Sequence, residues 1–466
     1  MASQGMSFVI SIFLARLLEP SEFGLIAMVM VIIGMAEVFT DIGLGGALIQ
    51  RRRVLPIHYS SVFYFNVFAS LLLTSVTYFS AGWIGKFYDN ETLIPLAKIL
   101  SLLFIINAFS SVHAVKLRKE LNYRLLVKLG FTASLISGVI GVSLAFAGFG
   151  LWSLVAQTLS RGLISNILIW SFGRWVPSML FSFKALKQLW GFGFRMFLSG
   201  LLDAIFTRLD FLVIGKMFPP ETLGFFQRAK SLNLMAVKYS SASLMGILFP
   251  VLSKIQKDLP RFQNVVLKSL GIICFVVFLL LGGLYLVSAE LITLVFGEKW
   301  LPSVRFFEVL VISGFGWPIS SLLVNVLSSR GNSKAFLRVE ILKKILLTTN
   351  LVVLMIWGIE VYLYGLIVQA TLGVSLNIHF AAREISLPQS QFFKPIFVQA
   401  LLAMGGVIST LLVVNQLGEW HDFVLLLIKG TLFALTYFLA NWWIDTNSFR
   451  ALKEQLIPIV KAKITG

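Results

Sequence analysis

Long apolar runs follow one another along the whole chain, separated by short connections that hold Pro, Gly and charged residues. A helix needs about 20 mostly apolar residues to cross a membrane, so these runs predict about fourteen spanning helices. We therefore expect an all-α polytopic membrane protein. The predicted spans are residues 2–18, 25–48, 59–84, 93–115, 129–147, 151–172, 190–218, 220–250, 265–296, 304–327, 337–357, 362–380, 393–414 and 423–444.

The seventh and eighth spans carry charged residues within otherwise apolar sequence. At about 100° per residue, one stripe on the seventh span covers roughly 120° of the helix surface. It consists of Arg195, Ser199, Asp203, Thr207 and Asp210. The stripe on the eighth span consists of Gln227, Lys230, Ser231, Lys238 and Ser241. Such stripes face a bundle interior or a watery cavity. We favour a cavity wall; the alternative is a set of paired charges that only lock helices together.

Local signals single out two stretches. Residues 173–189 mix basic and aromatic side chains, which suits a short interfacial segment that links two halves of the chain. The tenth predicted span contains Gly314, Gly316 and Pro318. Because proline removes a backbone hydrogen bond, we expect a kink there. The single cysteine, Cys274, lies in an apolar run and is expected to be a buried structural thiol.

Composition agrees with a membrane protein: 58% of residues are hydrophobic, 13% are charged, and the mean hydropathy is +0.88. The net charge of +18 does not indicate nucleic acid, because the basic residues gather in alternate connections. These connections are residues 51–53, 116–128, 174–187, 254–268, 330–344, 383–394 and 450–463. The positive-inside rule then places both termini in the cytoplasm.

The chain also matches itself. At an offset of 200, residues 15–24 (ARLLEPSEFG) align with residues 215–224 (GKMFPPETLG). At an offset of 210, the Asn, Arg and Lys at 122, 124 and 128 align with the Asn, Lys and Arg at 332, 334 and 338. We expect two parallel six-helix repeat bundles, residues 1–174 and 175–384. Residues 385–466 then form two additional C-terminal transmembrane helices and a cytoplasmic tail, and the substrate path lies between the halves.

Several motifs resemble one known family. They are LARLLEPSEFGLIAM at 14–28, FTDIGLGGALIQR at 39–51, LDFLVIGKMFPPETLGFFQRAKSL at 209–232, LVFGEKWLP at 294–302 and SRGNSKAFLRVEILKKI at 329–345. In this order they resemble the polysaccharide-transporter branch of the multidrug/oligosaccharidyl-lipid/polysaccharide exporter superfamily. Within it they are most similar to Wzx-type flippases and teichuronic or colanic acid exporters. Members usually have a longer leader, so the first helix looks truncated.

The resemblance implies a flippase of the bacterial cytoplasmic (inner) membrane. Its cargo would be an oligosaccharide on polyprenyl diphosphate, and membrane lipid and polysaccharide polymerase machinery would be its partners, without nucleic acid. A diphosphate needs cations in a low-dielectric site. The candidates are Arg195, Arg208, Lys230 and Lys238. Carboxylates in such sites can change protonation, so candidates for ion coupling are Glu37, Asp203 and Asp210. Asp41, which precedes IGLGG, is expected to be structural. No cofactor or metal is expected.

Three alternatives remain open. A drug or cation antiporter of the same superfamily would share the fold but would favour an acidic cavity. A polymerase or ligase of sugar chains, or a glycosyltransferase, would commonly need a substantial loop or soluble domain, whereas the outward connections here are mostly short and no DxD triplet occurs. The histidines show no metal spacing, and no Walker-A sequence is present. A scaffold without transport activity would require all intramembrane charges to be structural.

Overall fold

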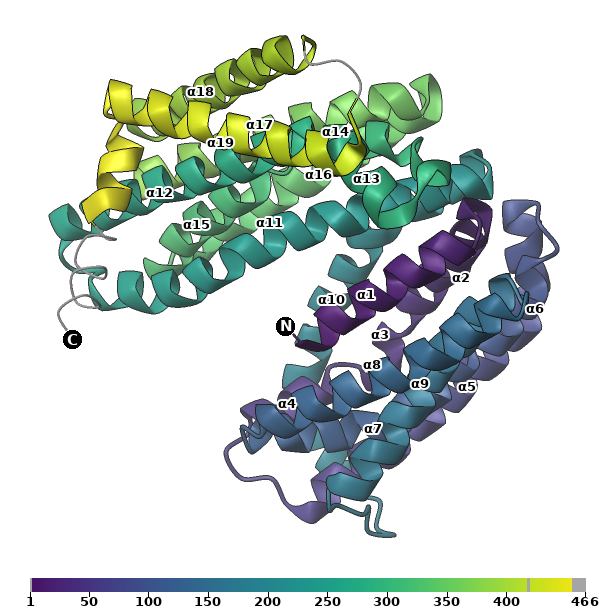
Figure 1. The fold of residues 1–466 in the computed structure, drawn as a ribbon. Helices are drawn as coiled ribbons and strands as arrows, with labels where there is room; N and C mark the ends of the chain where they lie inside the picture. Colours follow the sequence, from purple (N-terminus) through teal and green to yellow (C-terminus); the bar gives the residue numbers. More distant parts are fainter. Residues whose placement is uncertain (1, 417–419, 455–466) are drawn as a thin grey trace, which may run out of the picture. The chain divides into compact units, whose positions relative to one another are not determined.

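The computed structural model describes residues 2–416 and 420–454, with all their side chains except those of residues 2, 3 and 238–247. The chain divides into two compact units, unit 1 (Met1–Gln227) and unit 2 (Arg228–Gly466), and every regular element in the described residues is helical (Figure 1). Unit 1 holds α1 (Ala2–Leu17), α2 (Pro20–Ala36), α3 (Val38–Asp41), α4 (Leu44–Gln50), α5 (Pro56–Tyr88), α6 (Leu93–Leu100), α7 (Leu102–Lys119), α8 (Tyr123–Phe146), α9 (Leu151–Phe172) and α10 (Phe183–Met217).

The helix α11 (Pro220–Lys254) begins in unit 1 and continues into unit 2. Unit 2 also holds α12 (Leu259–Leu286), α13 (Ser288–Phe296), the short 3-10 turn η1 (Glu298–Trp300), α14 (Ser303–Ser313), α15 (Gly316–Ser329), α16 (Ser333–Trp357), α17 (Ile359–Glu384), α18 (Ser390–Val414) and α19 (Asp422–Ile444). The division between the two units falls within α11, after Gln227. The repeat boundary between residues 174 and 175 is a different division, based on the sequence alignment, and it stays a prediction.

Within the described part of the chain, nine helical segments are long and apolar enough to cross a membrane. They identify a multi-pass membrane protein, as predicted. The other predicted spans correspond to α1, α9, α10, α11 and α16, which are shorter or more polar than the rest. The predicted total of fourteen spans therefore continues to rest on the sequence pattern.

The prediction of one continuous helix over residues 25–48 is wrong. Helix α2 ends at Ala36, and the backbone takes left-handed conformations at Ile42 (φ 42°) and Gly43 (φ 72°). Two successive residues in that region cannot continue a right-handed helix. The Asp41 carboxylate accepts the N–H of Gly45, at 2.9 Å from Oδ1, and also the side-chain amide of Asn66 at 3.2 Å. Asp41 thus starts α4, which agrees with the structural role expected for it.

The predicted kink in the tenth span is confirmed. Helix α14 ends at Ser313 and α15 begins at Gly316, so Pro318 lies in the first turn of α15. A first-turn N–H has no partner within its own helix, and the N–H that proline lacks is therefore not missed there. The sequence pattern located this interruption because proline and glycine mark it directly.

The linking segment is shorter than predicted. Helix α10 begins at Phe183, capped by the hydroxyl of Ser182, so residues 183–189 are helical and the irregular stretch is residues 173–182. This stretch is tied to unit 1 by two hydroxyls of α5. Ser60 Oγ accepts the N–H of Ser178 at 2.9 Å, and Ser61 Oγ accepts the N–H of Ser182 at 3.0 Å. These hydrogen bonds give partners to backbone N–H groups that lie outside any helix.

The two motifs aligned at an offset of 200 have the same local geometry. Glu22 N–H bonds to Glu19 O at 3.1 Å, and the equivalent Thr222 N–H bonds to Pro219 O at 3.0 Å. Both α2 and α11 start with proline at the first helical position. The first turns of these helices cross at two glycines, Gly24 and Gly224, that leave no room for a side chain.

The motifs aligned at an offset of 210 also match in geometry. Asn122 caps α8 by accepting the N–H of Leu125 at 3.3 Å. Asn332 caps α16 by accepting the N–H of Ala335 at 3.0 Å. A left-handed residue, Leu121 or Gly331, precedes each cap. The sequence similarity therefore reflects equivalent helix starts in the two units.

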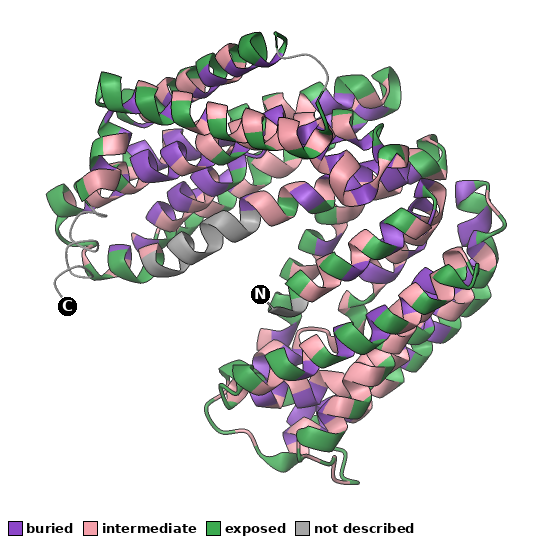
Figure 2. Ribbon diagram, in the orientation of Figure 1, coloured by how far each residue is buried: buried purple, intermediate pink, exposed green. Residues whose placement is uncertain are grey.

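Helices α18 and α19 pack on α12 through buried polar groups. Tyr437 donates to the carbonyl oxygen of Phe275 at 3.1 Å and also to the amide oxygen of Gln399. The Gln399 amide donates in turn to Asn441 Oδ1 at 2.8 Å, and Thr446 donates to the same oxygen at 2.7 Å. Figure 2 shows buried positions along α12 and exposed ones on the outer helices of unit 2. The last two helices are thus an integral part of unit 2.

Candidate substrate site

Helix α10 presents the polar stripe that the sequence predicted. It is one continuous helix of 35 residues, and Arg195, Ser199, Asp203 and Thr207 are all exposed along it. Thr207 donates to the carbonyl oxygen of Asp203, which keeps its hydroxyl on the helix backbone. Over the length of the stripe, the residues that α10 buries are Phe197 and Ala204, which lie on the opposite side of the helix. Charges of both signs are therefore accessible along one face of α10.

The Arg208 side chain packs against helix α2. A Cβ atom placed on Gly34 would lie 2.6 Å from Arg208 Nε and 2.9 Å from Nη2. The guanidinium therefore rests directly on the α2 backbone, in space that any side chain at position 34 would occupy. Arg208 is half-buried, so part of its surface remains accessible. A glycine in α2 thus fixes where this positive charge lies.

Glu37 lies one turn beyond Gly34, at the end of α2. It is exposed, and its Oε1 accepts a hydrogen bond from the Asn107 side chain of α7 at 2.8 Å. A break between α2 and α3 at Glu37 places this carboxylate at a helix end rather than within a regular turn. Two of the predicted residues therefore lie along neighbouring turns of α2: Arg208 of α10 contacts Gly34, and Glu37 follows one turn later.

A third charged residue, Arg161 of α9, lies next in sequence to a glycine that approaches Asn107, and it was not predicted. It is exposed in the middle of α9, and its side chain has no hydrogen-bond or ion-pair partner among the residues that the structure describes. The Cβ position of neighbouring Gly162 lies 3.9 Å from Asn107 Oδ1, so α9 approaches α7 close to the amide that binds Glu37. The sequence signal was an arginine amid the apolar run of residues 151–172.

The remaining predicted residues lie apart from this group. Asp210 is half-buried and accepts the backbone N–H of Phe211 at 2.9 Å. Lys230 is half-buried on the part of α11 that belongs to unit 2. The side chain of Lys238 lies outside the described residues. No group of three or more metal-ligating side chains occurs in the residues searched, which are the described ones.

Unit 2 buries another arginine that the sequence analysis did not single out. Arg228 is 8% exposed, and its guanidinium lies 5.6 Å from the ring centre of Phe296 and 5.5 Å from that of Trp300. Cation–π contact with the electron-rich ring faces stabilises a buried guanidinium. Arg228 is about 160° from Lys230 around α11, so it lies opposite the predicted stripe. The contact joins two motifs, FFQRAK and VFGEKW, that were recognised separately.

Comparisons of sequence point to polysaccharide biosynthesis. Residues 13–305 match a family described as "Polysaccharide biosynthesis protein". The teichuronic acid biosynthesis protein TuaB of Bacillus subtilis (strain 168) is 30% identical over 284 residues, which are 60% of this chain and 58% of that protein. The lipopolysaccharide biosynthesis protein WzxC of Escherichia coli (strain K12) is 26% identical over 337 residues, 69% of this chain and 66% of that protein. Each match spans less than two thirds of the relative's length.

Comparisons of structure point to one helical fold. The lipid II flippase MurJ in an inward closed conformation aligns with a TM-score of 0.74 and 15% identity over 98% of both chains. An inward-facing multidrug resistance MATE family transporter of the MOP superfamily aligns with a TM-score of 0.65 and 14% identity, over 82% of this chain and 94% of that one. At these identities the likeness concerns the fold alone.

Proposed function

Because the chain belongs to the polysaccharide biosynthesis protein family, as its motifs predicted, we propose that it moves a lipid-linked oligosaccharide across the bacterial cytoplasmic membrane. The cargo would be a glycan repeat unit on polyprenyl diphosphate, destined for surface or exported polysaccharide. Transport would proceed by alternating access, driven by an ion gradient, without chemistry on the cargo. Both termini would be cytoplasmic, in keeping with the basic connections.

The observation that carries this proposal is the group of charges around α2 in unit 1. Arg208 rests on Gly34, Glu37 is bound to Asn107, and Arg161 is accessible on α9. Charged groups within membrane-spanning helices are costly and mark pathways for polar cargo. A diphosphate would interact with the two guanidinium groups, which are well suited to phosphate geometry. Arg195, Lys230 and Lys238 are further candidates along the path.

We also propose two six-helix repeats with fourteen spans. The equivalent geometries at Glu22 and Thr222, and at Asn122 and Asn332, support this arrangement. An even number of helices per repeat gives two halves related by an axis along the membrane normal. Polysaccharide polymerase machinery would receive the translocated cargo.

An export assay in cells that lack their own flippase tests this function. Arg208→Gln should reduce surface polysaccharide at least tenfold, because it removes the cation, and Arg208→Lys should retain part of the activity. Gly34→Ala keeps the arginine but occupies its space, and we expect an intermediate loss. The matched control is Lys98→Gln, which removes a positive charge that lies 5.0 Å from the Tyr78 ring. Wild-type export by Arg208→Gln and by Arg161→Gln, singly and together, would exclude this site.

The antiporter alternative is tested in the same cells. A drug or cation antiporter would alter resistance to cationic dyes while leaving surface polysaccharide unchanged. We expect the opposite result, since two accessible arginines, Arg208 and Arg161, accompany the Glu37 carboxylate. A polymerase or ligase would leave lipid-linked repeat units on the outer leaflet when deleted, whereas loss of a flippase leaves them on the inner leaflet.

A further inference from the structure

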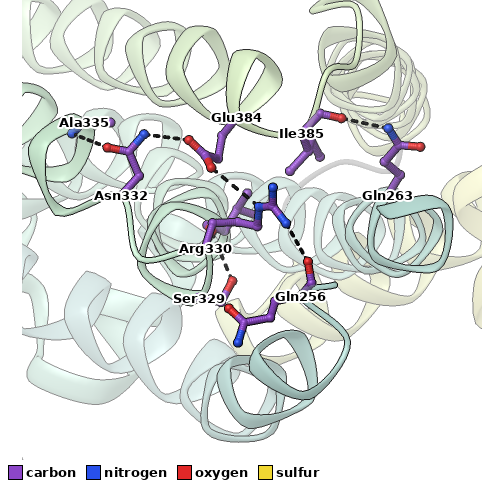
Figure 3. A network of polar contacts seen from close by, with 9 residues as sticks. Gln256, Gln263, Ser329, Arg330, Asn332, Ala335, Glu384 and Ile385 are labelled. Atoms are coloured by element: carbon purple, nitrogen blue, oxygen red, sulfur yellow. Dashed lines mark hydrogen bonds and ion pairs between the residues drawn. The ribbon is translucent and has the colours of Figure 1, made fainter. Parts of the chain in front are cut away.

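The end of unit 2 that contains residues 330–332 carries a polar network that Figure 3 shows. Arg330 Nε lies 3.5 Å from Glu384 Oε1, and Arg330 Nη1 donates to the carbonyl oxygen of Gln256 at 2.5 Å. Asn332 donates to the second oxygen of Glu384 at 2.6 Å. Both oxygens of the Glu384 carboxylate therefore already have partners. Its negative charge is offset within the network and is not available to neighbouring cations.

A cavity of about 310 Å³ adjoins this network. It is lined by Asn332, Lys334, Ala335, Arg338, Phe380, Arg383 and Glu384. The side chains of Lys334, Arg338 and Arg383 are exposed and have no hydrogen-bond or ion-pair partner within the described ranges. The nearby Glu340 is paired with Lys343 at 2.5 Å and does not compensate them. Three positive charges thus converge on one cavity without a free carboxylate.

The charges also repel one another. Lys334 and Arg338 are four residues apart on α16 and therefore lie on the same helix face, where like charges are unfavourable. Arg383 comes from the last turn of α17, the helix that packs against α16. The cavity also adjoins the first turn of α16, whose free N–H groups favour negative charge. An anion in the cavity would relieve the repulsion and interact with all three cations.

The same face of α16 becomes apolar immediately beyond the cations. Leu337, Ile341 and Ile345 are 58%, 50% and 55% exposed. At about 100° per residue, they fall within roughly 100° of helix surface together with Lys334 and Arg338. In a membrane protein, exposed aliphatic side chains of this kind contact lipid chains. A ligand that fits both parts has an anionic head at the cavity and apolar chains along α16.

We propose that this cavity binds the headgroup of an anionic glycerophospholipid, with the acyl chains lying on Leu337, Ile341 and Ile345. The site is separate from the charges around α2 and does not depend on the identity of the cargo. Helix α8 provides a natural comparison because Asn122, Arg124 and Lys128 occupy the equivalent positions. At the same offset the residue equivalent to Arg383 is Gly173, and the arginine comes one residue later, at Arg174.

Native mass spectrometry of the full-length protein tests this site, with detergent solution supplemented by equal amounts of phosphatidylglycerol and phosphatidylcholine. Wild-type protein should retain phosphatidylglycerol preferentially. Lys334→Gln/Arg338→Gln/Arg383→Gln should reduce that retention at least tenfold. The charge-preserving variant Lys334→Arg/Arg338→Lys/Arg383→Lys should keep most of it and shows that the substituted region folds. Arg52→Gln/Arg53→Gln/Arg124→Gln removes three other exposed positive charges and should retain phosphatidylglycerol as wild type does.

Several results would overturn the proposal. Equal loss in the two Gln triple variants would show that overall charge, and not this cavity, attracts the lipid. Binding of soluble glycerol phosphate as strong as that of phosphatidylglycerol would show a site for free anions instead of lipid. Equal retention of phosphatidylcholine by wild type would show that the headgroup charge is not recognised.

Discussion

Gly24 and Gly224 pack reciprocally, each against the proline carbonyl that starts the helix of the other. A Cβ on Gly24 would lie 1.7 Å from Pro220 O, and a Cβ on Gly224 would lie 2.0 Å from Pro20 O. Because the obstructing atoms are backbone, neither side can move aside cheaply. The crossing of α2 and α11 therefore requires glycine at both positions.

We predict that Gly24→Ala or Gly224→Ala destabilises the protein by about 1–3 kcal/mol, the usual cost of overpacking. The melting temperature in detergent measures the effect. The control is Gly82→Ala in α5, where a Cβ would meet no atom within 4 Å and alanine favours the helix. Unchanged melting of both variants would show that the helices can separate at this crossing.

The contact of Arg228 with the rings of Phe296 and Trp300 gives a second prediction. Replacing Trp300 with leucine should cost on the order of 2 kcal/mol, because the buried guanidinium loses a ring face. Arg228→Lys should also destabilise, since ammonium is more strongly hydrated than guanidinium and suits a buried aromatic site less well. The same melting assay measures both. If Arg228→Met is more stable than wild type while export is lost, the arginine serves transport at the expense of stability.

The buried ion pair between Lys429 of α19 and Glu290 of α13 gives a third prediction. The side chains are 15% and 7% exposed. Lys429→Met alone should destabilise by about 3–5 kcal/mol, because it leaves a buried carboxylate without its cation. Glu290→Leu/Lys429→Met should recover most of the loss.

The surface ion pair between Lys216 and Asp89, at 2.6 Å, is the matched control for that experiment. Its side chains are 40% and 78% exposed, so Lys216→Met should cost less than about 1 kcal/mol. If the double variant of the buried pair is as unstable as Lys429→Met, packing and not charge explains the loss.

The fourth prediction concerns ion coupling. Asp203→Asn and Glu37→Gln should each weaken export or its dependence on external pH, because both carboxylates are exposed within membrane-spanning unit 1. Asp210→Asn is tested beside them. Asp41→Asn should instead lower stability, since its carboxylate holds the start of α4. Wild-type export at every pH by all three coupling variants would leave the carboxylates with structural roles only.

The fifth prediction concerns topology. The single native cysteine, Cys274, is fully buried, so introduced cysteines can be labelled without interference. Asn90→Cys should react with an impermeant maleimide from outside the cell, and Arg52→Cys only after the membrane is opened. Reaction of both cysteines from outside the cell would contradict the predicted topology.

The sequence predicted the structure best where a single local feature, such as hydropathy or a proline, determines the backbone. Apolar runs located the helices, Pro318 located the interruption after α14, and the aligned motifs located equivalent helix starts. The break at Ile42 and Gly43 was missed because hydropathy does not register backbone conformation. The seventh span was predicted to begin at Trp190, seven residues after α10 starts at Phe183, because the mixed composition of residues 183–189 concealed the start of the helix.

The candidate site was predictable only in part. Helix periodicity identified the stripe on α10, but the contact of Arg208 with Gly34 depends on how α10 packs on α2. Arg228 was passed over because it lies opposite the stripe, facing rings 68 and 72 residues later in the chain. Such pairings depend on tertiary contacts that no local pattern contains.

The polar network among Tyr437, Gln399 and Asn441 has a practical consequence. It fixes α18 and α19 to α12, so a spectroscopic label on α19 would report the motion of unit 2 as a whole. Leu439 is 59% exposed and would accept such a label without disturbing the network. Phe79 of α5, which is 84% exposed, is the corresponding attachment point in unit 1. Distances between spin labels at these two positions, with and without cargo, would follow the transport cycle. Neither label would replace a residue of the candidate substrate site.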